Sequence, residues 1–186
     1  MKRIGIIGDI GSGKSYVARN FGYPAFNADL EVKKIYKTNK KCFKKLKKKF
    51  PRSIKNFPII KSELIKILNK KNLKILSKIV HPFVRAEMKK FLKKKKSKKY
   101  VILDIPLLIE SKLYNKNDII IYIKTKKSVI QRRLIRRKNY NKEVLNMLES
   151  QQLDSNKKIK LSHYLINNSF DKKNTLKQII KIKKMI

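Results

Sequence analysis

The residues with the clearest chemistry form a glycine-rich loop near the N-terminus. Residues 8–15 read G-D-I-G-S-G-K-S and fit the phosphate-loop pattern G-x-x-x-x-G-K-[ST], between a strand-like apolar run and a helical pattern. Glycines let such a loop turn successive backbone N–H groups toward phosphate oxygens. Lys14 is expected to bridge the β- and γ-phosphates, and the Ser15 hydroxyl to ligate Mg²⁺. The pattern predicts a site for ATP or GTP, built from Gly8, Gly11, Ser12, Gly13, Lys14 and Ser15.

Acidic residues are scarce, with 12 Asp and Glu against 51 Lys and Arg, so an acid at a motif position is informative. Asp29 and Asp104 both come at the carboxyl ends of predicted strands, where open α/β sheets bind ligands. Asp29 is expected to act as a general base toward a hydroxyl acceptor; its alternative role is an N-cap for a helix from Leu30. Asp104 is expected to hold Mg²⁺ through water; its alternative is an ordinary acid at a strand end.

Half of the eight arginines lie within six residues: Arg132, Arg133, Arg136 and Arg137. Because lysine is the cation almost everywhere else, this cluster indicates a need for the planar guanidinium, which grips phosphate oxygens bidentately. We expect a lid over about 126–158 that closes on the ATP phosphates. Arg133 and Arg137 share one helix face and are the expected catalytic pair of this lid. The alternative is a solvated helix face.

Strands and helices must alternate to place these residues. Runs that are apolar throughout, as in a parallel sheet, predict strands over 2–8, 24–28, 100–105, 118–123 and 164–166. Helical spacing predicts helices over 12–21, 30–50, 62–80, 82–95, 126–137 and 141–153, and a C-terminal helix that Asp171 caps. Leu176, Ile179 and Ile180 are expected to face inward from this last helix.

The order of these elements predicts an α/β fold with a parallel sheet. The helical stretch over about 30–95 is too long for one crossover and is expected to be an insert between the second and third strands. The whole chain, 1–186, is therefore predicted to be a single domain.

Composition excludes several classes of protein. Cys42 is the single cysteine and sits on an apolar helix face, so it is expected in the core, and an intramolecular disulfide is impossible. A reducing, cytoplasmic location fits this. The longest apolar run is too short to span a bilayer, and the N-terminus lacks the apolar core of a signal peptide, so no membrane association is expected.

The net charge of +39 has two explanations. A selected surface for polyanions is one of them. The other is genome composition, because Lys, Ile and Asn have A/T-rich codons and are all abundant here. The lysines are also spread along the whole chain, whereas a binding protein would gather them in one stripe. Genome composition is the favoured explanation.

Several motifs, in order along nearly the whole chain, resemble those of the dephospho-coenzyme A kinase family, which catalyses the last step of coenzyme A synthesis. The matching segments are the phosphate loop, F-N-A-D at 26–29, H-P at 81–82, P-L-L-I-E at 106–110, the arginine-rich helix with Gln151 beyond it, and Asn168. The P-L-L-x-E match is the most specific, because it is not a general feature of phosphate-loop proteins.

The resemblance implies a P-loop kinase-like, three-layer α/β/α fold with a helical acceptor-binding insert and an arginine-bearing lid. It implies ATP- and Mg²⁺-dependent transfer of the γ-phosphoryl group to the ribose 3′-hydroxyl of dephospho-coenzyme A, giving coenzyme A and ADP. Asp29 would be the base for this acceptor. Tyr16 and Asn168 would add to the nucleotide site. The implied substrate contacts, besides Asp29, are His81, Pro106, Leu107, Leu108 and Glu110.

The chain departs from the family pattern at a few positions. Asp9 stands where the family usually has Gly, Tyr16 where it usually has Thr, and Asn27 replaces the first Asp of D-A-D. Ser162-His163 replaces the usual Ala-Asp, and the segment after Phe50 is shorter than usual. None of these changes removes Lys14, Ser15 or Asp29.

Two other functions remain as alternatives. The first is a kinase of another nucleoside or nucleotide on the same fold, against which the H-P and P-L-L-x-E motifs argue. The second is a basic phosphate-loop protein that binds nucleic acid, which would be expected to show clustered arginines with stacking aromatic residues. The one arginine cluster is better explained by ATP, so specific nucleic-acid binding is not expected.

Overall fold

The computed structural model describes residues 1–136 and 140–186, which form two units. The first unit comprises Met1–Asn27 and Lys95–Ile186, and the second comprises Ala28–Lys94. Among the described residues, no helix is both long and apolar enough to cross a membrane.

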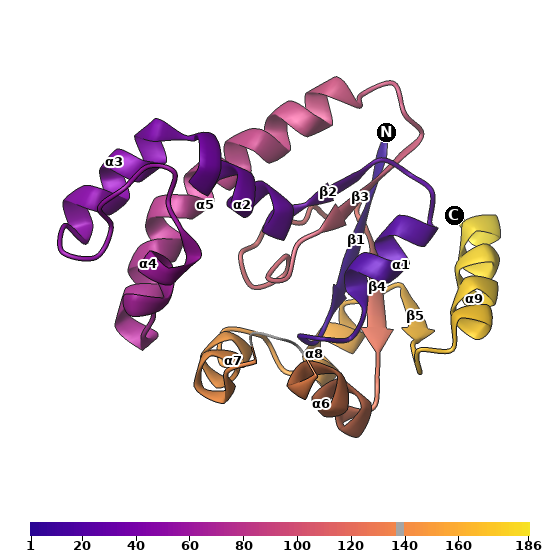
Figure 1. Cartoon of the computed structure of the whole chain (residues 1–186). Helices are drawn as coiled ribbons and strands as arrows, with labels where there is room; N and C mark the ends of the chain where they lie inside the picture. The colour runs from indigo at the N-terminus through magenta and orange to yellow at the C-terminus, as the bar shows by residue number, and fades with distance from the viewer. Residues whose placement is uncertain (137–139) are drawn as a thin grey trace. The chain divides into compact units, whose positions relative to one another are not determined.

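A five-stranded sheet forms the centre of the first unit (Figure 1). Its strands are β1 (Lys2–Gly8), β2 (Ala25–Asn27), β3 (Tyr100–Asp104), β4 (Ile119–Lys124) and β5 (Tyr164–Asn167). They lie in the order β2-β3-β1-β4-β5, and every neighbouring pair is parallel. The carboxyl ends of all five strands therefore meet at one edge. The predicted α/β fold with a parallel sheet is confirmed.

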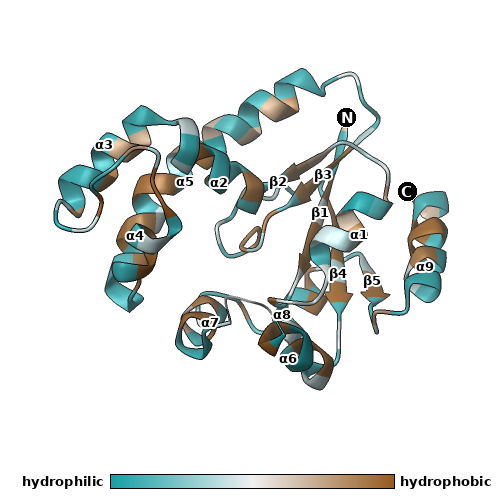
Figure 2. Ribbon diagram, viewed as in Figure 1, coloured by the Kyte–Doolittle hydropathy of each residue, from teal (hydrophilic) through white to brown (hydrophobic). Residues whose placement is uncertain are grey.

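The first unit also contains five helices: α1 (Lys14–Asn20), α6 (Lys127–Ile135), α7 (Lys142–Glu149), α8 (Ser155–Lys160) and α9 (Lys172–Met185). Of these, α1, α8 and α9 pack against the strands. On one face, Val17 and Phe21 pack with Ile179 of α9 against Ile6 and Ile121 of the strands. On the other face, Leu108 fills the space above Gly5, where an added Cβ would lie 2.4 Å from Leu108 Cδ2. Figure 2 shows the apolar colouring concentrated along the strands.

The N-cap of α9 agrees with the prediction from the sequence, but the buried face of α9 does not. Asp171 caps α9 as predicted, because its carboxylate accepts a bond of 3.1 Å from the backbone N–H of Asn174. The inward face of α9 is shifted, however. Thr175, Ile179 and Ile182 are buried, whereas Leu176 and Ile180 are exposed. The expectation for Leu176 and Ile180 is wrong because α9 packs mainly on β5 and α1, and this contact buries a narrower stripe than its apolar residues cover.

The second unit consists of helices: α2 (Ala28–Thr38), α3 (Lys40–Lys49), α4 (Lys61–Lys66) and α5 (Lys70–Lys94). The single helix predicted over 30–50 is two helices, because the Asn39 side chain accepts a bond of 2.8 Å from the Cys42 N–H and caps α3. Cys42 is fully buried on the inner face of α3, as expected, and this burial raises the pKa of its thiol to about 11.

Pro82 lies inside α5 and does not end it, so the break predicted at this residue is wrong. Proline costs one backbone hydrogen bond and crowds the preceding turn. The helix continues because Leu76 and Val80 before the proline, and Val84 and Met88 after it, are all buried. Burial of this continuous apolar stripe offsets the local loss.

Candidate active site

The phosphate loop joins the end of β1 to the start of α1, at the carboxyl edge of the sheet. Two glycines are required by its conformation. Gly11 and Gly13 have φ of +84° and +95°, in the left-handed region that side chains disfavour. A Cβ at Gly13 would also lie 2.3 Å from Asn168 Nδ2. The loop can therefore keep its path only with glycine at these two positions.

The Lys14 ammonium rests on the loop itself. Its Nζ donates to the Gly8 carbonyl oxygen at 3.0 Å and to the Asp9 carbonyl oxygen at 2.8 Å, and the residue is 9% exposed. The adjacent Ser15 is half-buried in the first turn of α1. A cation held by two carbonyls is positioned without being neutralised, so it remains able to meet phosphate charge.

Asn168, which follows β5, holds the phosphate loop through a hydrogen bond to its backbone. It is 2% exposed, and its Nδ2 donates to the Ser12 carbonyl oxygen at 2.8 Å. Its Oδ1 accepts bonds from the Phe170 N–H at 3.1 Å and the Thr175 hydroxyl at 3.3 Å. Thr125 Oγ1 donates to the same Ser12 oxygen at 3.1 Å. The sequence does not identify these two threonines, because Thr125 follows β4 and Thr175 lies within α9, and no motif marks either residue.

Among the described arginines, Arg133 lies beside the phosphate loop. Its NH1 donates to the Gly11 carbonyl oxygen at 3.5 Å, and its Cζ lies 4.5 Å from the centroid of the Phe170 ring. Arg132 on the same helix and Arg136 at its C-cap are exposed, as is Arg133 itself. Arg137 lies outside the described residues. The guanidinium of Arg133 thus lies over an aromatic ring beside the phosphate loop.

We predict that Arg133→Lys lowers kcat about tenfold or more, because an ammonium cannot both stack on Phe170 and present a planar fork to phosphate. Arg132→Lys is the matched control, because it replaces the neighbouring exposed arginine of the same helix, and it should behave like the parent. Steady-state rates at saturating ATP measure both. If Arg133→Lys turned over at the parental rate, Arg133 would be only part of a solvated helix face.

Asp104 lies at the end of β3, next to β1, and is 3% exposed. Its carboxylate accepts a hydrogen bond from the side-chain amide of Asn27, at the end of β2. This contact explains the departure at Asn27. An aspartate there would face Asp104 with a second negative charge, whereas an amide donates to it. Asp104 and Ser15 together offer hard oxygen ligands, which suit Mg²⁺.

The P-L-L-I-E segment, 106–110, follows β3 and is tied to the loop by a residue that the motif comparison missed. Gln152 Nε2 donates to the Gly8 carbonyl oxygen at 3.4 Å and to the Pro106 carbonyl oxygen at 3.3 Å. The sequence resemblance points instead to the neighbouring Gln151. Glu110 Oε1 accepts a bond of 2.9 Å from the Leu153 N–H. Leu108 is fully buried over the sheet, while Pro106 and Leu107 are partly exposed.

Three further predicted site residues are placed as follows. Asp29 is exposed in the first turn of α2, which begins at Ala28, so it does not cap a helix from Leu30. His81 is half-buried in α5, and burial lowers its pKa, with the nearby Arg85 charge adding to the effect. Tyr16 packs against the apolar core between α1 and the sheet.

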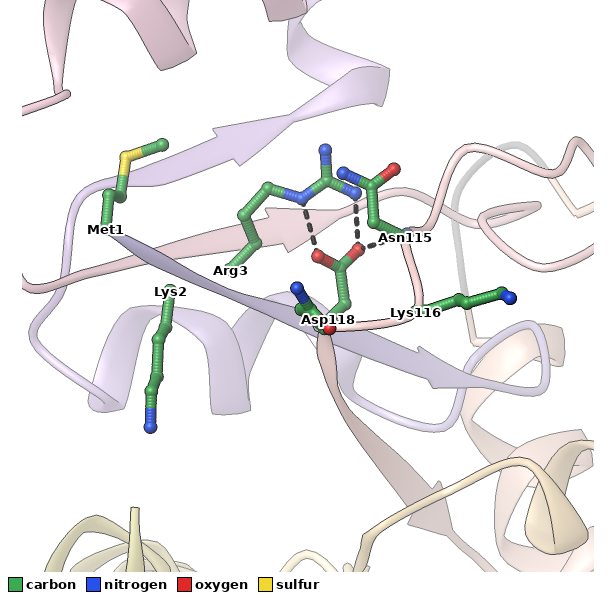
Figure 3. A pocket seen from close by; sticks show the side chains of 7 residues that line it. Met1, Lys2, Arg3, Asn115, Lys116 and Asp118 are labelled. Carbon is green, nitrogen blue, oxygen red and sulfur yellow. Dashed lines mark hydrogen bonds and ion pairs between the residues drawn. The ribbon is translucent and has the colours of Figure 1, made fainter.

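A hollow at the opposite end of the sheet is not part of this site (Figure 3). It lies at the start of β1, where the Arg3 guanidinium pairs with the buried Asp118 carboxylate and also donates to the Leu113 carbonyl oxygen at 3.1 Å. Open parallel sheets bind ligands at their carboxyl ends, and this hollow is at the amino end. We therefore assign the hollow no ligand. The bonds from Arg3 to Asp118 and Leu113 fix the segment between P-L-L-I-E and β4 to the start of β1.

Comparison with known proteins agrees with this geometry. The family model described as dephospho-CoA kinase matches residues 2–174. A dephospho-CoA kinase of Wolbachia pipientis wMel is 34% identical over 183 residues, which cover 95% of this chain and 93% of the relative.

Solved structures share the fold. The crystal structure of TT1252 from Thermus thermophilus has a TM-score of 0.79 and 26% identity, covering 99% of this chain and 96% of that chain. A dephospho-CoA kinase from Campylobacter jejuni has a TM-score of 0.64 and 23% identity, with the same coverage of 99% and 96%. The fold is thus that of P-loop kinases, and the family match extends over nearly the whole sequence: this chain belongs to the dephospho-CoA kinase family.

Proposed function

We propose that this chain transfers the γ-phosphoryl group of ATP to the ribose 3′-hydroxyl of dephospho-coenzyme A. The acceptor oxygen forms a bond to the γ-phosphorus, the bond from that phosphorus to the β–γ bridging oxygen breaks, and ADP leaves. The hydroxyl proton passes to the Asp29 carboxylate. The observation that carries the proposal is the Lys14 ammonium, held by two carbonyls of the loop in a chain of this family.

The nucleotide side of the reaction is assigned to the first unit. The loop from Gly8 to Ser15 would receive the phosphates, with its backbone N–H groups as donors. Lys14 would meet the charge that develops on the transferred group. Arg133, already beside Gly11, would add a second cation, and Arg137 is proposed with it as part of a lid over 126–158. Asn168 and Tyr16 would act by fixing the loop and its helix.

Mg²⁺ is proposed as the cofactor, held by the Ser15 hydroxyl and, through water, by Asp104. When bound, the ion neutralises charge on the phosphates and fixes their geometry. The Asn27 amide donates a hydrogen bond to the Asp104 carboxylate and so fixes its position for this role.

The acceptor side is assigned to Asp29, His81 and the P-L-L-I-E segment. His81 would be neutral at physiological pH, since both burial and Arg85 lower its pKa, so it can hydrogen-bond a polar acceptor group without adding charge. Pro106, Leu107 and Glu110 would line the acceptor side, with Leu108 anchoring them to the sheet. The second unit, 28–94, would hold the acceptor. A cytoplasmic location of the protein is also proposed.

The test is an acceptor panel with ATP and Mg²⁺. We expect ADP release with dephospho-coenzyme A, and ³¹P spectra of the product should show a new phosphomonoester at the ribose 3′ position. Adenosine, AMP and a 3′-deoxy analogue of dephospho-coenzyme A should give only background hydrolysis. Faster ADP release with adenosine or AMP would instead support the nucleoside or nucleotide kinase alternative.

A further inference from the structure

The second residue of the phosphate loop carries a carboxylate that three side chains hold from outside the loop. Lys158 Nζ donates to Asp9 Oδ1 at 2.6 Å, Ser155 Oγ to Oδ2 at 3.1 Å, and the Tyr122 hydroxyl to Oδ2 at 3.3 Å. Lys158 and Ser155 belong to α8, and Tyr122 belongs to β4. Asp9 is therefore the point at which the loop is joined to both elements.

The charges in this cluster are unequally exposed. The Lys158 side chain is 2% exposed and that of Asp9 is 28% exposed. A buried ammonium is costly unless a partner of opposite charge meets it, and Asp9 is such a partner. Asp9 also touches the phosphate-binding machinery directly, because its carbonyl oxygen accepts a hydrogen bond from Lys14 Nζ at 2.8 Å.

The negative charge of Asp9 would repel the phosphates that the loop is proposed to bind. Two like charges a few ångströms apart near a protein surface repel by several times the thermal energy. Lys158 places a positive charge 2.6 Å from this carboxylate, and its burial keeps that charge from being screened by salt.

We infer that Asp9 and Lys158 are positioning residues of the phosphate loop. The pair ties the loop to α8, and the Lys158 charge keeps the Asp9 carboxylate from repelling ATP. The inference rests on the proposed function only in taking ATP as the ligand of the loop. It predicts effects of opposite sign from the two single charge removals, whereas a purely structural latch predicts that both weaken binding.

Titration calorimetry with ATP and Mg²⁺, without acceptor, tests this. Lys158→Met should raise the Kd for ATP about tenfold or more, because it leaves the carboxylate without its counter-charge. Asp9→Asn should leave the Kd at or below the parental value, although the protein should melt at a lower temperature. The double variant Asp9→Asn/Lys158→Met should return to within about threefold of the parent. Lys157→Met, which removes an exposed charge from the same helix, should change the Kd less than twofold.

Several outcomes would overturn the inference: equal weakening by both single variants, no effect of Lys158→Met, or a double variant as weak as Lys158→Met. If Asp9→Asn does not fold, the comparison of Lys158→Met with the double variant still decides between the two explanations. Failure of the proposed function looks different. In that case the parent itself would bind no ATP, or would bind ATP and leave dephospho-coenzyme A unphosphorylated.

Discussion

Replacing Lys14 by alanine is expected to lower kcat by about a hundredfold to a thousandfold, the usual effect of removing one preorganised donor to transition-state charge. The ammonium is positioned before any substrate arrives, since the Gly8 and Asp9 carbonyls already hold it. Its loss therefore removes the one positively charged side chain of residues 8–15. The KM for ATP should rise less than kcat falls.

The control for this variant must separate charge from packing. Lys14 is buried, so alanine also removes the stem of the side chain and leaves two carbonyls without their donor. Lys14→Met keeps most of the volume and removes the ammonium, with its charge and its two hydrogen bonds to the carbonyls. We expect Lys14→Met and Lys14→Ala to be similarly inactive, and Lys14→Met to melt at a higher temperature. A Lys14→Met enzyme within about tenfold of the parent would contradict the role of this cation.

The sequence predicts the central sheet well, because buried parallel strands are short apolar runs that local composition identifies. Helix boundaries depend on single side chains and were predicted less well. Asn39 splits one predicted helix in two by accepting the Cys42 N–H, and Asp154 starts α8 by accepting the Asn156 N–H. Both are ordinary cap residues within charged stretches, where the apolar pattern hides them.

The motif identifies the phosphate loop, but the sequence does not identify the residues that hydrogen-bond to the loop from other elements. Gln152, Thr125 and Lys158 reach the loop from segments more than 100 residues away, and no local spacing marks them. The sequence shows Asp9 only as a residue that stands where the family usually has Gly. Its meaning depends on Lys158, which is one of many lysines in the chain until the fold buries it.

Asp29→Asn is expected to cut turnover by roughly a hundredfold or more, the usual contribution of a general base, while ATP binding changes little. Asparagine keeps the size of the side chain and can still accept a hydrogen bond, but it cannot take the proton of the acceptor hydroxyl. Because Asp29 lies in the first turn of α2, the substitution also removes a favourable charge at the helix N-terminus, which costs about 0.3–1 kcal/mol of stability.

Glu31→Gln is the matched control, because it removes the same charge from the same turn of α2. The two variants should lose similar stability in thermal melts, and only Asp29→Asn should lose turnover. Asp29→Ala then separates two roles within the catalytic explanation. If Asn and Ala are equally inactive, proton acceptance by the carboxylate is what matters; if Asn retains much of the rate and Ala does not, Asp29 chiefly orients the acceptor hydroxyl. Should both variants turn over like Glu31→Gln, Asp29 would be only a charge at the start of a helix, and the acceptor would have to be activated by another residue.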